Sequence, residues 1–360
     1  MKIAMIANSS SGLYEFRREL ILRLIADGYE VIALTPYDGR EEQLKETGIK
    51  LINVAVDRRG MNPIHDLFLL NTYRKIIKAE KPDQVVTYTI KPNIYGGAVC
   101  RLLKVPYAAN ITGLGTAFEI QGFLRKIITT MYRYSLKRAK SVFFENSENL
   151  QIFLDKTIIR KKQAVLLNGA GVNLEHFSVL QYPENNDETR FLFMGRVMAE
   201  KGVNELFEAM RMLKKDGYNC TLDMLGGFDE NYEQKIKEAE FEGWLKYRGY
   251  QSDVRPFIRK CHCFVLPSYH EGMANTNLEC ASSGRPVITS NIPGCKEAVI
   301  EGVSGLLCEP KTADSLYIAM KQMAEMSIDE RRAMGLAGRK RMEDVFDKKK
   351  VVEETIMHLV

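Results

Sequence analysis

The chain of 360 residues is long enough for two domains of ordinary size, because a single hydrophobic core seldom organises so many residues. Its apolar content of 45% and charged content of 27% are those of a globular protein, and it lacks the run of about eighteen apolar residues that a membrane-spanning helix needs. Seven cysteines, an odd number spread along the chain, favour a reducing cytoplasm over a disulfide framework.

Charge is unevenly distributed between the two halves. Residues 1–170 hold 26 basic and 16 acidic residues, a net charge of +10, whereas the remainder holds 25 and 30. Such an asymmetry suggests an anionic surface or substrate on the N-terminal side. The chain shows neither the aromatic–basic pattern of RNA-binding domains nor a helix-turn-helix spacing. We therefore expect a membrane surface, and no nucleic acid, as the anionic partner.

Apolar runs of strand length alternate with helical patterns along the chain. In the first half we expect strands at 3–7, 30–35, 50–56, 84–88, 107–109, 141–144 and 164–167, with helices such as 14–27 and 64–80 between them. In the second half we expect strands at 190–194, 220–225, 246–249, 263–266, 286–290 and 305–308. This alternation predicts parallel sheets with right-handed crossovers, and hence an α/β fold of two doubly wound, Rossmann-like domains.

A linker is expected between the two halves, because residues 179–189 contain a proline, two adjacent asparagines and several acidic residues. We place an N-terminal domain at 1–173 and a C-terminal domain at 174–344. Two such domains facing each other would bind a ligand in the cleft between the carboxyl ends of their sheets, where open α/β sheets bind ligands.

Three loops with glycine follow predicted strands. Gly12 ends the loop after the first strand, where the backbone could approach a phosphate or an acceptor, and Gly227 follows the strand at 220–225. The loop at 110–118 begins like a dinucleotide-binding fingerprint, but Phe118 stands where the third glycine belongs. This loop also does not follow the first strand, so a Rossmann dehydrogenase is disfavoured.

Two cations follow the first strand of the second half. Arg196 lies just past that strand, and Lys201 lies at the entry to a helix. Arg offers phosphate oxygens a planar fork and Lys a point charge, so together they could hold a diphosphate; the alternative is two solvated surface cations. These cations could also stabilise a leaving diphosphate, so we expect no metal there.

Two glutamates stand eight residues apart near a predicted turn. Glu271 follows the strand at 263–266, and Glu279 lies inside a short predicted helix. A strand end, a turn and a helix N-terminus make an anion site, because the first helical N–H groups lack intrahelical partners. Glu279, two turns further at roughly 1.5 Å per residue, could reach a ribose diol. The segment predicts a sugar-nucleotide site at Glu271, Gly272, Met273, Ala274, Asn275, Thr276 and Glu279.

A basic amphipathic helix is predicted at 122–140, which holds six basic residues and no acidic one. Apolar residues recur at helical spacing in this segment, at Phe123, Leu124, Ile127, Ile128, Met131 and Leu136. Such a helix can lie in an anionic headgroup layer. The alternative is a domain helix whose apolar side is core and whose basic side is solvated, and both can hold at once.

The segment from Glu271 to Glu279, with Gly284-Arg285-Pro286 after it, resembles the E-x7-E element of retaining GT-B glycosyltransferases of family 4. Residues 195–202 resemble the Gly-Arg…Lys-Gly element of the same family. The resemblance covers essentially the whole chain. It implies a GT-B fold with an interdomain cleft, a last helix at about 345–360 that packs back on the N-terminal domain, and no cofactor. It also implies catalytic roles for Arg196, Lys201 and Glu271.

The resemblance extends to both substrates. Residues 246–254 look like the strand and turn that offer backbone to the nucleobase, which places Tyr250 there, and uridine is the base that the family favours. Residues 87–96 and 14–18 look like bacterial members that extend polyprenyl-diphosphate-linked sugars, among them N-acetylgalactosaminyl- and galactosyltransferases. Lys91 and Arg17 would meet an acidic acceptor, unless Lys91 is an ordinary surface lysine. The full acceptor set is expected at Tyr14, Arg17, Lys91, Asn93, Thr112 and Gly113, although many members carry a histidine near Thr112 and this chain has none there.

These features together predict a cytoplasmic glycosyltransferase that lies peripherally on the inner face of the cytoplasmic membrane. It would move a hexose or N-acetylhexosamine from a UDP-sugar to a polyprenyl-diphosphate-linked glycan of capsule, O-antigen or glycoprotein assembly. The resemblance implies retention of configuration by front-face attack, with the departing phosphate taking the acceptor proton. The alternatives are a nucleotide-sugar 2-epimerase of the same fold and a non-catalytic nucleotide-sugar-binding scaffold.

Overall fold

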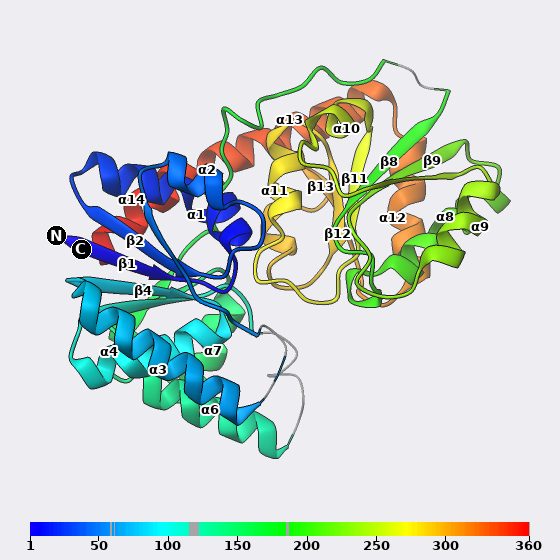
Figure 1. The fold of residues 1–360 in the computed structure, drawn as a ribbon. Helices are drawn as coiled ribbons and strands as arrows, with labels where there is room; N and C mark the ends of the chain where they lie inside the picture. The colour runs from blue at the N-terminus through cyan, green and yellow to red at the C-terminus, as the bar shows by residue number, and fades with distance from the viewer. Residues whose placement is uncertain (58–59, 61, 115–121, 185–186, 360) are drawn as a thin grey trace. The chain divides into compact units, whose positions relative to one another are not determined.

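A computed structural model describes residues 1–57, 60, 62–114, 122–184 and 187–359. The chain forms two compact units (Figure 1). Unit 1 comprises Met1–Ala170 together with Lys349–Val360, and unit 2 comprises Gly171–Lys348. Each unit is built around one sheet whose strands all run parallel, with helices in the connections. The predicted fold class, two doubly wound α/β domains, is confirmed.

Unit 1 contains a seven-stranded sheet in the order β3-β2-β1-β4-β5-β6-β7. Its strands are β1 Lys2–Ile6, β2 Glu30–Thr35, β3 Lys50–Asn53, β4 Gln84–Tyr88, β5 Tyr107–Ile111, β6 Val142–Phe144 and β7 Ala164–Leu166. Its helices are α1 Ser10–Ala26, α2 Glu41–Glu46, α3 Pro63–Glu80, η1 Pro92–Gly96, α4 Gly97–Leu103, α6 Phe123–Leu136, α7 Ser147–Asp155, η2 Lys161–Gln163 and α14 Lys348–Leu359.

Both faces of this sheet are covered, as a parallel sheet requires. Apolar residues of α1, α2 and α14 pack on one face, and those of α3, α4, α6 and α7 pack on the other (Figure 1). The C-terminal helix is fixed by more than apolar contacts, since Ser141 Oγ donates a hydrogen bond to the carbonyl of His358 at 2.9 Å. The last residues of the chain therefore belong to the first domain in space.

Unit 2 contains a six-stranded sheet in the order β10-β9-β8-β11-β12-β13, around a single apolar core. Its strands are β8 Thr189–Met194, β9 Cys220–Leu225, β10 Leu245–Gly249, β11 Cys263–Leu266, β12 Val287–Ser290 and β13 Gly305–Cys308. Its helices are η3 Ala199–Lys201, α8 Val203–Lys215, α9 Glu233–Phe241, α10 Arg255–Lys260, α11 Asn275–Ser282, η4 Lys296–Ala298, α12 Ala313–Glu325, α13 Ile328–Arg341 and η5 Met342–Phe346.

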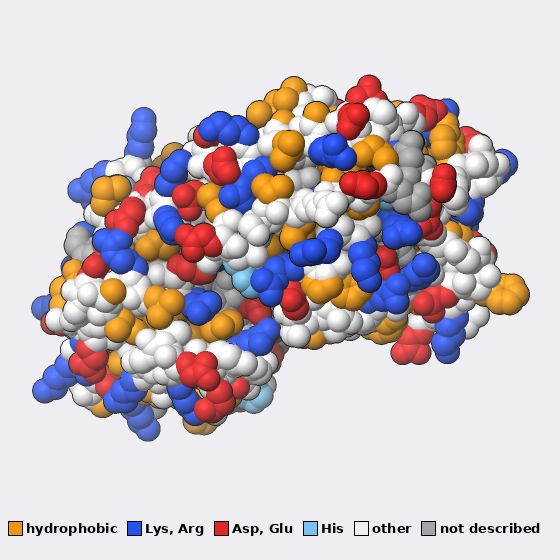
Figure 2. Space-filling view, turned by 90° about the horizontal axis from the view of Figure 1, so that it is seen from above, with side chains coloured by type: hydrophobic (Ala, Val, Ile, Leu, Met, Phe, Trp, Pro, Cys, Tyr) orange, Lys and Arg blue, Asp and Glu red, His pale blue; other side chains and the backbone are white. Residues whose placement is uncertain are grey.

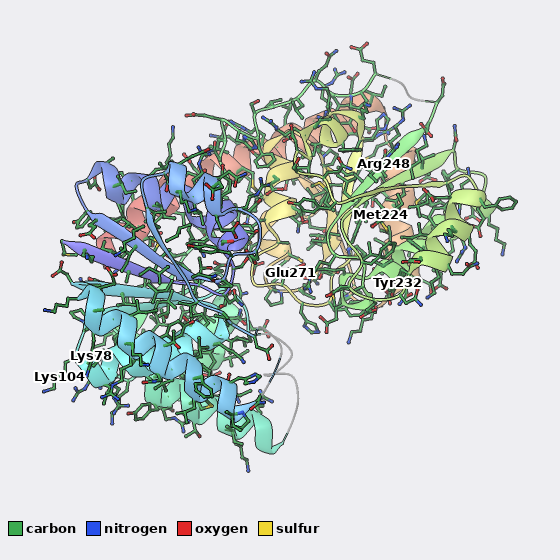
Figure 3. All side chains as sticks on the ribbon, viewed as in Figure 1. Lys78, Lys104, Met224, Tyr232, Arg248 and Glu271 are labelled. Carbon is green, nitrogen blue, oxygen red and sulfur yellow. The ribbon has the colours of Figure 1, made fainter. Side chains whose placement is uncertain are left out.

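Each sheet has a point where the strand order reverses. In unit 1 this switch point lies between β1 and β4, and in unit 2 it lies between β8 and β11. Open α/β sheets bind ligands at the carboxyl ends of the strands at such a point. Arg196 follows β8, and Glu271, which Figure 3 labels, follows β11, so these two predicted site residues flank the switch point of unit 2.

The surface mixes both signs of charge. Lys and Arg side chains are interspersed with Asp and Glu side chains over the face that Figure 2 shows. All seven cysteines are buried and unpaired, at Cys100, Cys220, Cys261, Cys263, Cys280, Cys295 and Cys308. Burial raises the pKa of the Cys261 thiol to about 12, so this thiol stays protonated in neutral solution.

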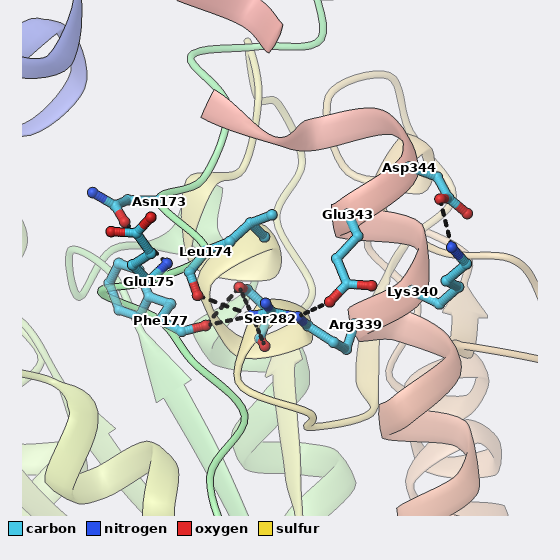
Figure 4. Close-up of polar contacts among 9 residues, drawn as sticks. All are labelled: Asn173, Leu174, Glu175, Phe177, Ser282, Arg339, Lys340, Glu343 and Asp344. Carbon is cyan, nitrogen blue, oxygen red and sulfur yellow. Dashed lines mark hydrogen bonds and ion pairs between the residues drawn. The ribbon is translucent and has the colours of Figure 1, made fainter. Parts of the chain in front are cut away.

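Two arginines, one partly buried and one fully buried, fasten the chain that enters unit 2. Arg339 Nη1 donates to the carbonyls of Leu174, Phe177 and Ser282 at 3.0 to 3.1 Å, and its Nε pairs with Glu343 at 2.7 Å (Figure 4). An arginine can hold several carbonyls at once because its guanidinium has five N–H donors in a fixed plane. The segment before β8 is thus tied to α11 and α13.

Arg285 does the same from the interior and is fully buried. Its Nε donates to the carbonyl of Ile258 at 2.9 Å, and its Nη2 donates to the carbonyls of Gln181 and Arg259 at 2.7 and 3.1 Å. Its guanidinium also lies 5.1 Å from the ring centre of Tyr182, within cation–π range. Arg285 of the predicted Gly-Arg-Pro segment therefore joins three chain segments through backbone carbonyls.

We expect Arg285→Lys to lower the free energy of unfolding by about 3 kcal/mol, because a single ammonium cannot span carbonyls that a planar fork reaches together. Urea unfolding followed by fluorescence would measure the change. Arg332→Lys is the matched control, since Arg332 is exposed and pairs with Asp329 at 3.2 Å. The control should change the free energy by less than about 0.5 kcal/mol. Equal losses in both variants would contradict the role of Arg285.

Candidate functional site

The predicted donor-binding residues gather at one edge of unit 2. Arg196 follows β8, Gly227 follows β9, Tyr250 follows β10 and Glu271 follows β11. These strands are neighbours and run parallel, so their carboxyl ends meet at the same edge of the sheet. The structure thereby brings together four residues that stand up to 75 positions apart in the chain.

Lys201 and Glu271 form an ion pair, with Lys201 Nζ donating to Glu271 Oε1. The side chains are only 16% and 14% exposed, so each carries its charge where water screens it poorly. Gly202 makes this pair possible. It has φ +71°, and a Cβ there would lie 2.1 Å from the carbonyl oxygen of Pro267, so only glycine lets the two loops approach this closely.

Arg196 lies on the same loop in a more open setting. Its Nη1 pairs with Asp229 Oδ2 at 2.6 Å, and the Arg196 side chain is 55% exposed. Asp229 belongs to the loop after β9 and is not among the residues that the sequence indicated. The pairing of Asp229 with Arg196 follows from the strand order. Because β8 and β9 are neighbours in the sheet, the loops that follow them lie next to each other. Strand order was needed to see it.

The segment from Glu271 to Glu279 forms the predicted turn and helix. Helix α11 begins at Asn275 and has no side-chain hydrogen bond at its N-cap, Ala274. Asn275 Oδ1 is buried and has no hydrogen-bond partner among the described residues. A polar ligand could satisfy this oxygen, because a buried carbonyl oxygen without a donor is unfavourable. Met273 and Ala274 are buried, and Glu279 is partly buried.

A second close approach holds this turn. Gly294 has φ +83°, and a Cβ there would lie 2.6 Å from the carbonyl oxygen of Glu271 and 2.7 Å from that of Gly272. The Ala274 N–H donates to the Gly294 carbonyl at 2.7 Å. The loop after β12 thus supports the turn that carries Glu271. Tyr250, by contrast, is 71% exposed, and its predicted role at the nucleobase stays a prediction.

The N-terminus of α1 is occupied by groups of the chain itself. The Gly12 N–H donates to Ser9 Oγ at 3.0 Å, and the Ser11 N–H donates to Asp38 Oδ1 at 2.9 Å. Ser10 Oγ donates to the same carboxylate at 2.6 Å. Asp38 therefore lies where a helix N-terminus would attract an anion. A phosphate contact by Gly12, as the sequence predicts, would have to replace the bond to Ser9.

Arg17 is directed inward rather than to a ligand. It is 7% exposed and pairs with Glu145 at 2.6 Å, and its guanidinium lies 5.0 Å from the ring centre of Tyr88. Burial raises the pKa of the Tyr88 hydroxyl to about 12. Glu145 follows β6, which lies far from α1 in the chain. Its contact with α1 was therefore not predicted from the sequence. The ring of Tyr14 lies 5.5 Å from the Arg18 guanidinium.

Lys91 borders a pocket of about 360 Å³. Its Nζ pairs with Asp66 Oδ1 at 2.7 Å, and Tyr95 donates its hydroxyl to Asp66 Oδ2 at 2.8 Å. The side chains of Lys91 and Asp66 are only 15% and 14% exposed, so both residues are partly buried rather than on the open surface. The other residues that line the pocket include both polar and apolar side chains: Asn53, Val54, Ala55, Asp57, His65, Phe68, Leu69 and Thr72.

Asn93 is used inside the fold. It is 1% exposed, its Oδ1 accepts from the Thr87 hydroxyl at 2.7 Å, and its Nδ2 donates to the Asn110 carbonyl at 2.8 Å. These bonds occupy the amide that the sequence assigned to the acceptor. Thr112 and Gly113 follow β5 and are partly exposed, and the rest of the glycine loop, 115–118, lies outside the described residues.

No group of three or more His, Cys, Asp or Glu side chains in the described part of the chain is arranged to hold a metal ion. Cys261-His262-Cys263 contains residue types that bind metals, but its histidine has a structural role. His262 is fully buried, and its Nδ1 accepts a hydrogen bond from the Arg190 N–H at 3.0 Å. His262 therefore joins the start of β8 to β11.

Helix α6 corresponds to the predicted basic amphipathic segment. Ile128, Met131 and Leu136 pack into the core of unit 1, whereas Ile127 and Tyr134 are 39% and 53% exposed. Lys126, Lys137 and Arg138 are also exposed. One side of the helix is therefore core, and the other presents basic and apolar groups to solvent. The side chains of Phe123 and Leu124 lie outside the described residues.

Comparison with known proteins gives two family matches. Residues 2–146 match the family described as glycosyl transferase 4-like, and residues 178–341 match the family described as glycosyl transferases group 1. The N,N'-diacetylbacillosaminyl-diphospho-undecaprenol alpha-1,3-N-acetylgalactosaminyltransferase of Campylobacter jejuni is 29% identical over 94% of this chain and 92% of its own. The capsular polysaccharide biosynthesis glycosyltransferase CapM of Staphylococcus aureus is 24% identical over 88% and 86%.

A third relative and the solved structures agree with these matches. The UDP-Gal:alpha-D-GlcNAc-diphosphoundecaprenol alpha-1,3-galactosyltransferase of Escherichia coli is 27% identical over 74% of this chain and 73% of its own. The Anabaena protein HepE, in a crystal structure with UDP and glucose, superposes with a TM-score of 0.82 at 15% identity, covering 100% of this chain and 99% of its own. A glycosyltransferase of Rickettsia africae superposes with a TM-score of 0.79 at 18% identity, covering 99% and 97%.

We expect Arg17→Met to lower the free energy of unfolding by about 3 kcal/mol, because it leaves the buried Glu145 carboxylate without its counter-charge. Arg18→Met is the control, since Arg18 is exposed on the same helix. Thermal and urea unfolding would measure both. If Arg17→Met kept wild-type stability yet lost the use of an acidic acceptor, the role that the sequence assigned to Arg17 would be right and the structural one wrong.

Proposed function

We propose that this chain, which belongs to the glycosyltransferases of group 1 and the 4-like family with the GT-B fold, transfers a hexose or N-acetylhexosamine from a UDP-sugar to a polyprenyl-diphosphate-linked glycan. The observation that carries the proposal is the meeting of Arg196, Lys201 and Glu271 at the switch point of unit 2. Cations and a carboxylate at that place suit a sugar diphosphate. Relatives that match most of the chain are named for undecaprenyl-diphosphate-linked acceptors.

Unit 2 binds the donor in this proposal. Arg196 and Lys201 hold the diphosphate, and Glu271 positions the sugar beside it. Asn275 Oδ1 accepts a hydrogen bond from the ligand, which removes an unsatisfied buried oxygen. Glu279 binds the ribose, and Tyr250 lies at the base. The remaining donor contacts of unit 2 come from Gly227, Gly272, Met273, Ala274 and Thr276.

The chemistry follows from this arrangement. The bond from the anomeric carbon to the diphosphate oxygen breaks while the acceptor hydroxyl forms a new bond on the same face of the sugar. The acceptor proton passes to the departing phosphate oxygen. Arg196 and Lys201 stabilise the charge that develops on the leaving group, in place of a divalent ion. Retention of configuration results, and no separate base is required.

Unit 1 binds the acceptor. The pocket beside Lys91 offers charged, amide and hydroxyl groups next to an exposed aromatic ring, Phe68. That mixture suits a sugar, whose hydroxyls take hydrogen bonds and whose ring face packs on an aromatic side chain. Thr112 and Gly113 lie on the loop after β5, and Tyr14 lies near the start of α1, which follows β1 at the same edge of the sheet.

Incubation with labelled UDP-sugars, with and without lipid extract from a bacterial membrane, tests the proposal. Label should enter the lipid fraction only when lipid is present, and excess EDTA should leave the rate unchanged. A 2-epimerase would convert the sugar without lipid, and a scaffold would do neither. Loss of transfer on chelation, restored by Mg²⁺ or Mn²⁺, would overturn the metal-free mechanism.

Replacement of Arg196 or Lys201 with Ala should reduce transfer by about two powers of ten, since one strong leaving-group contact contributes about 3 kcal/mol. The measurement is kcat with a saturating UDP-sugar. Melting temperature should change little in Arg196→Ala, because that side chain is half exposed. Arg211→Ala, which removes an exposed pair with Glu242 on the same unit, is the control. Turnover near wild type in Arg196→Ala and Lys201→Ala would refute the assignment.

Association with a membrane surface is the second part of the proposal. No helix in the described part of the chain is both long and apolar enough to cross a bilayer. Contact would therefore come from the exposed side of α6. Each basic residue near an anionic surface contributes about 1 kcal/mol, which high salt reduces.

Reversal of Lys126, Lys137 and Arg138 to Glu should release the protein from anionic vesicles in a flotation assay at low salt. Transfer to a short water-soluble acceptor should stay near the wild-type rate, because these residues lie outside the proposed donor and acceptor sites. Reversal of Lys237, Lys246 and Lys260, exposed on unit 2, changes the net charge equally and should leave flotation intact. Binding that ignores lipid charge, salt and both sets of reversals would refute the membrane contact.

A further inference from the structure

We propose that Asp229 is a positioning residue that orients Arg196 toward the donor diphosphate. The inference rests on the proposed function, because it takes Arg196 as a diphosphate ligand. Asp229 Oδ2 lies 2.6 Å from Arg196 Nη1, and the Asp229 side chain is 19% exposed, far less than the arginine that it holds. The carboxylate is therefore the fixed member of the pair.

Backbone contacts fix Asp229 in place. The Asp229 N–H donates to the Val197 carbonyl at 3.2 Å, and the Val197 N–H donates to the Gly227 carbonyl at 2.9 Å. These two bonds form an isolated parallel bridge, in which Val197 pairs with Phe228, between the loops after β8 and β9. Gly226 permits the approach, since a Cβ there would lie 1.8 Å from the Gly195 carbonyl oxygen. Arg196 and its partner thus belong to one rigid pair of loops.

A second acidic residue of the same loop acts on the other loop. Glu230 Oε2 accepts a hydrogen bond from the Ala199 N–H at 3.0 Å, at the start of the short helix that ends at Lys201. The loop after β9 therefore contacts the segment of both predicted diphosphate cations, Arg196 through its side chain and the short helix that carries Lys201 through the Ala199 N–H. An incidental surface ion pair would require only one of these two contacts, so the presence of both favours a positioning role.

The geometry leaves most of the guanidinium available. Asp229 uses Nη1, and a guanidinium has further N–H donors on Nε and Nη2 in the same plane. A phosphate can bind that second edge while Asp229 holds the first. An exposed arginine without such a partner would lose rotamer freedom on binding, so prior orientation should tighten binding.

The test compares UDP with uridine, which has the base and ribose but no phosphate, by titration calorimetry. Asp229→Ala should weaken UDP binding about fivefold and leave uridine binding unchanged. Asp229→Asn should weaken UDP less, because the amide oxygen still accepts from Nη1. In an Arg196→Ala background, Asp229→Ala should have no further effect.

Glu188→Ala is the matched control. Glu188 pairs with Arg190 at 2.6 Å with side chains 21% and 38% exposed, at the opposite end of the same strand. Glu188→Ala should change neither the affinity for UDP nor the affinity for uridine. If Arg196→Ala weakens UDP binding and Asp229→Ala does not, or Asp229→Ala tightens it, the positioning role is refuted while the donor site stands. If Arg196→Ala also binds UDP like the wild type, the proposed donor site fails, and the role of Asp229 with it.

Discussion

The carboxyl ends of parallel strands meet at one edge of each sheet, and every candidate site residue depends on that constraint. All thirteen strands among the described residues run parallel within their sheets. Parallel sheets are buried on both faces, so the loops at the edges are the places where polar side chains can meet a ligand. Which loops meet is decided by strand order rather than by chain order. Arg196 and Glu271 therefore become neighbours although two strands, β9 and β10, separate β8 from β11 in sequence.

At these edges the predicted cations are paired with carboxylates. Lys201 pairs with Glu271, Lys91 with Asp66 and Arg196 with Asp229. A partly buried cation without a counter-charge would be costly, so a ligand-free site needs such partners. In the proposed site a diphosphate would bind Lys201 and the guanidinium edge of Arg196 that Asp229 does not use. Because carboxylates already balance both cations, selectivity would depend on geometry.

The strands were predictable because buried parallel strands are continuous apolar runs, and all thirteen expected runs are strands in the structure. The family was predictable from Arg196, Lys201 and the two glutamates, and both family matches confirm it. The partner carboxylates Asp38, Asp66, Asp229 and Glu145 were not, because each lies on a loop or in the first turn of a helix whose neighbours are set by strand order. The surroundings of Asn93 were not predictable either: its amide is buried in hydrogen bonds to Thr87 and Asn110, and its acceptor role stays a prediction.

The two cations of the donor site differ in a way that divides their roles. Lys201 forms an ion pair with Glu271, the residue proposed to position the sugar, so in the proposed site one coupled pair would contact both the leaving group and the sugar. Removing either member leaves the other partly buried and unpaired, and their energetic effects cannot add. Arg196 is half exposed and pairs with a different carboxylate, Asp229. Its contribution to diphosphate binding can therefore be varied without disturbing Glu271. Sugar choice is therefore expected to depend on Lys201 and Glu271 together, whereas diphosphate affinity can be tuned through Arg196 and Asp229.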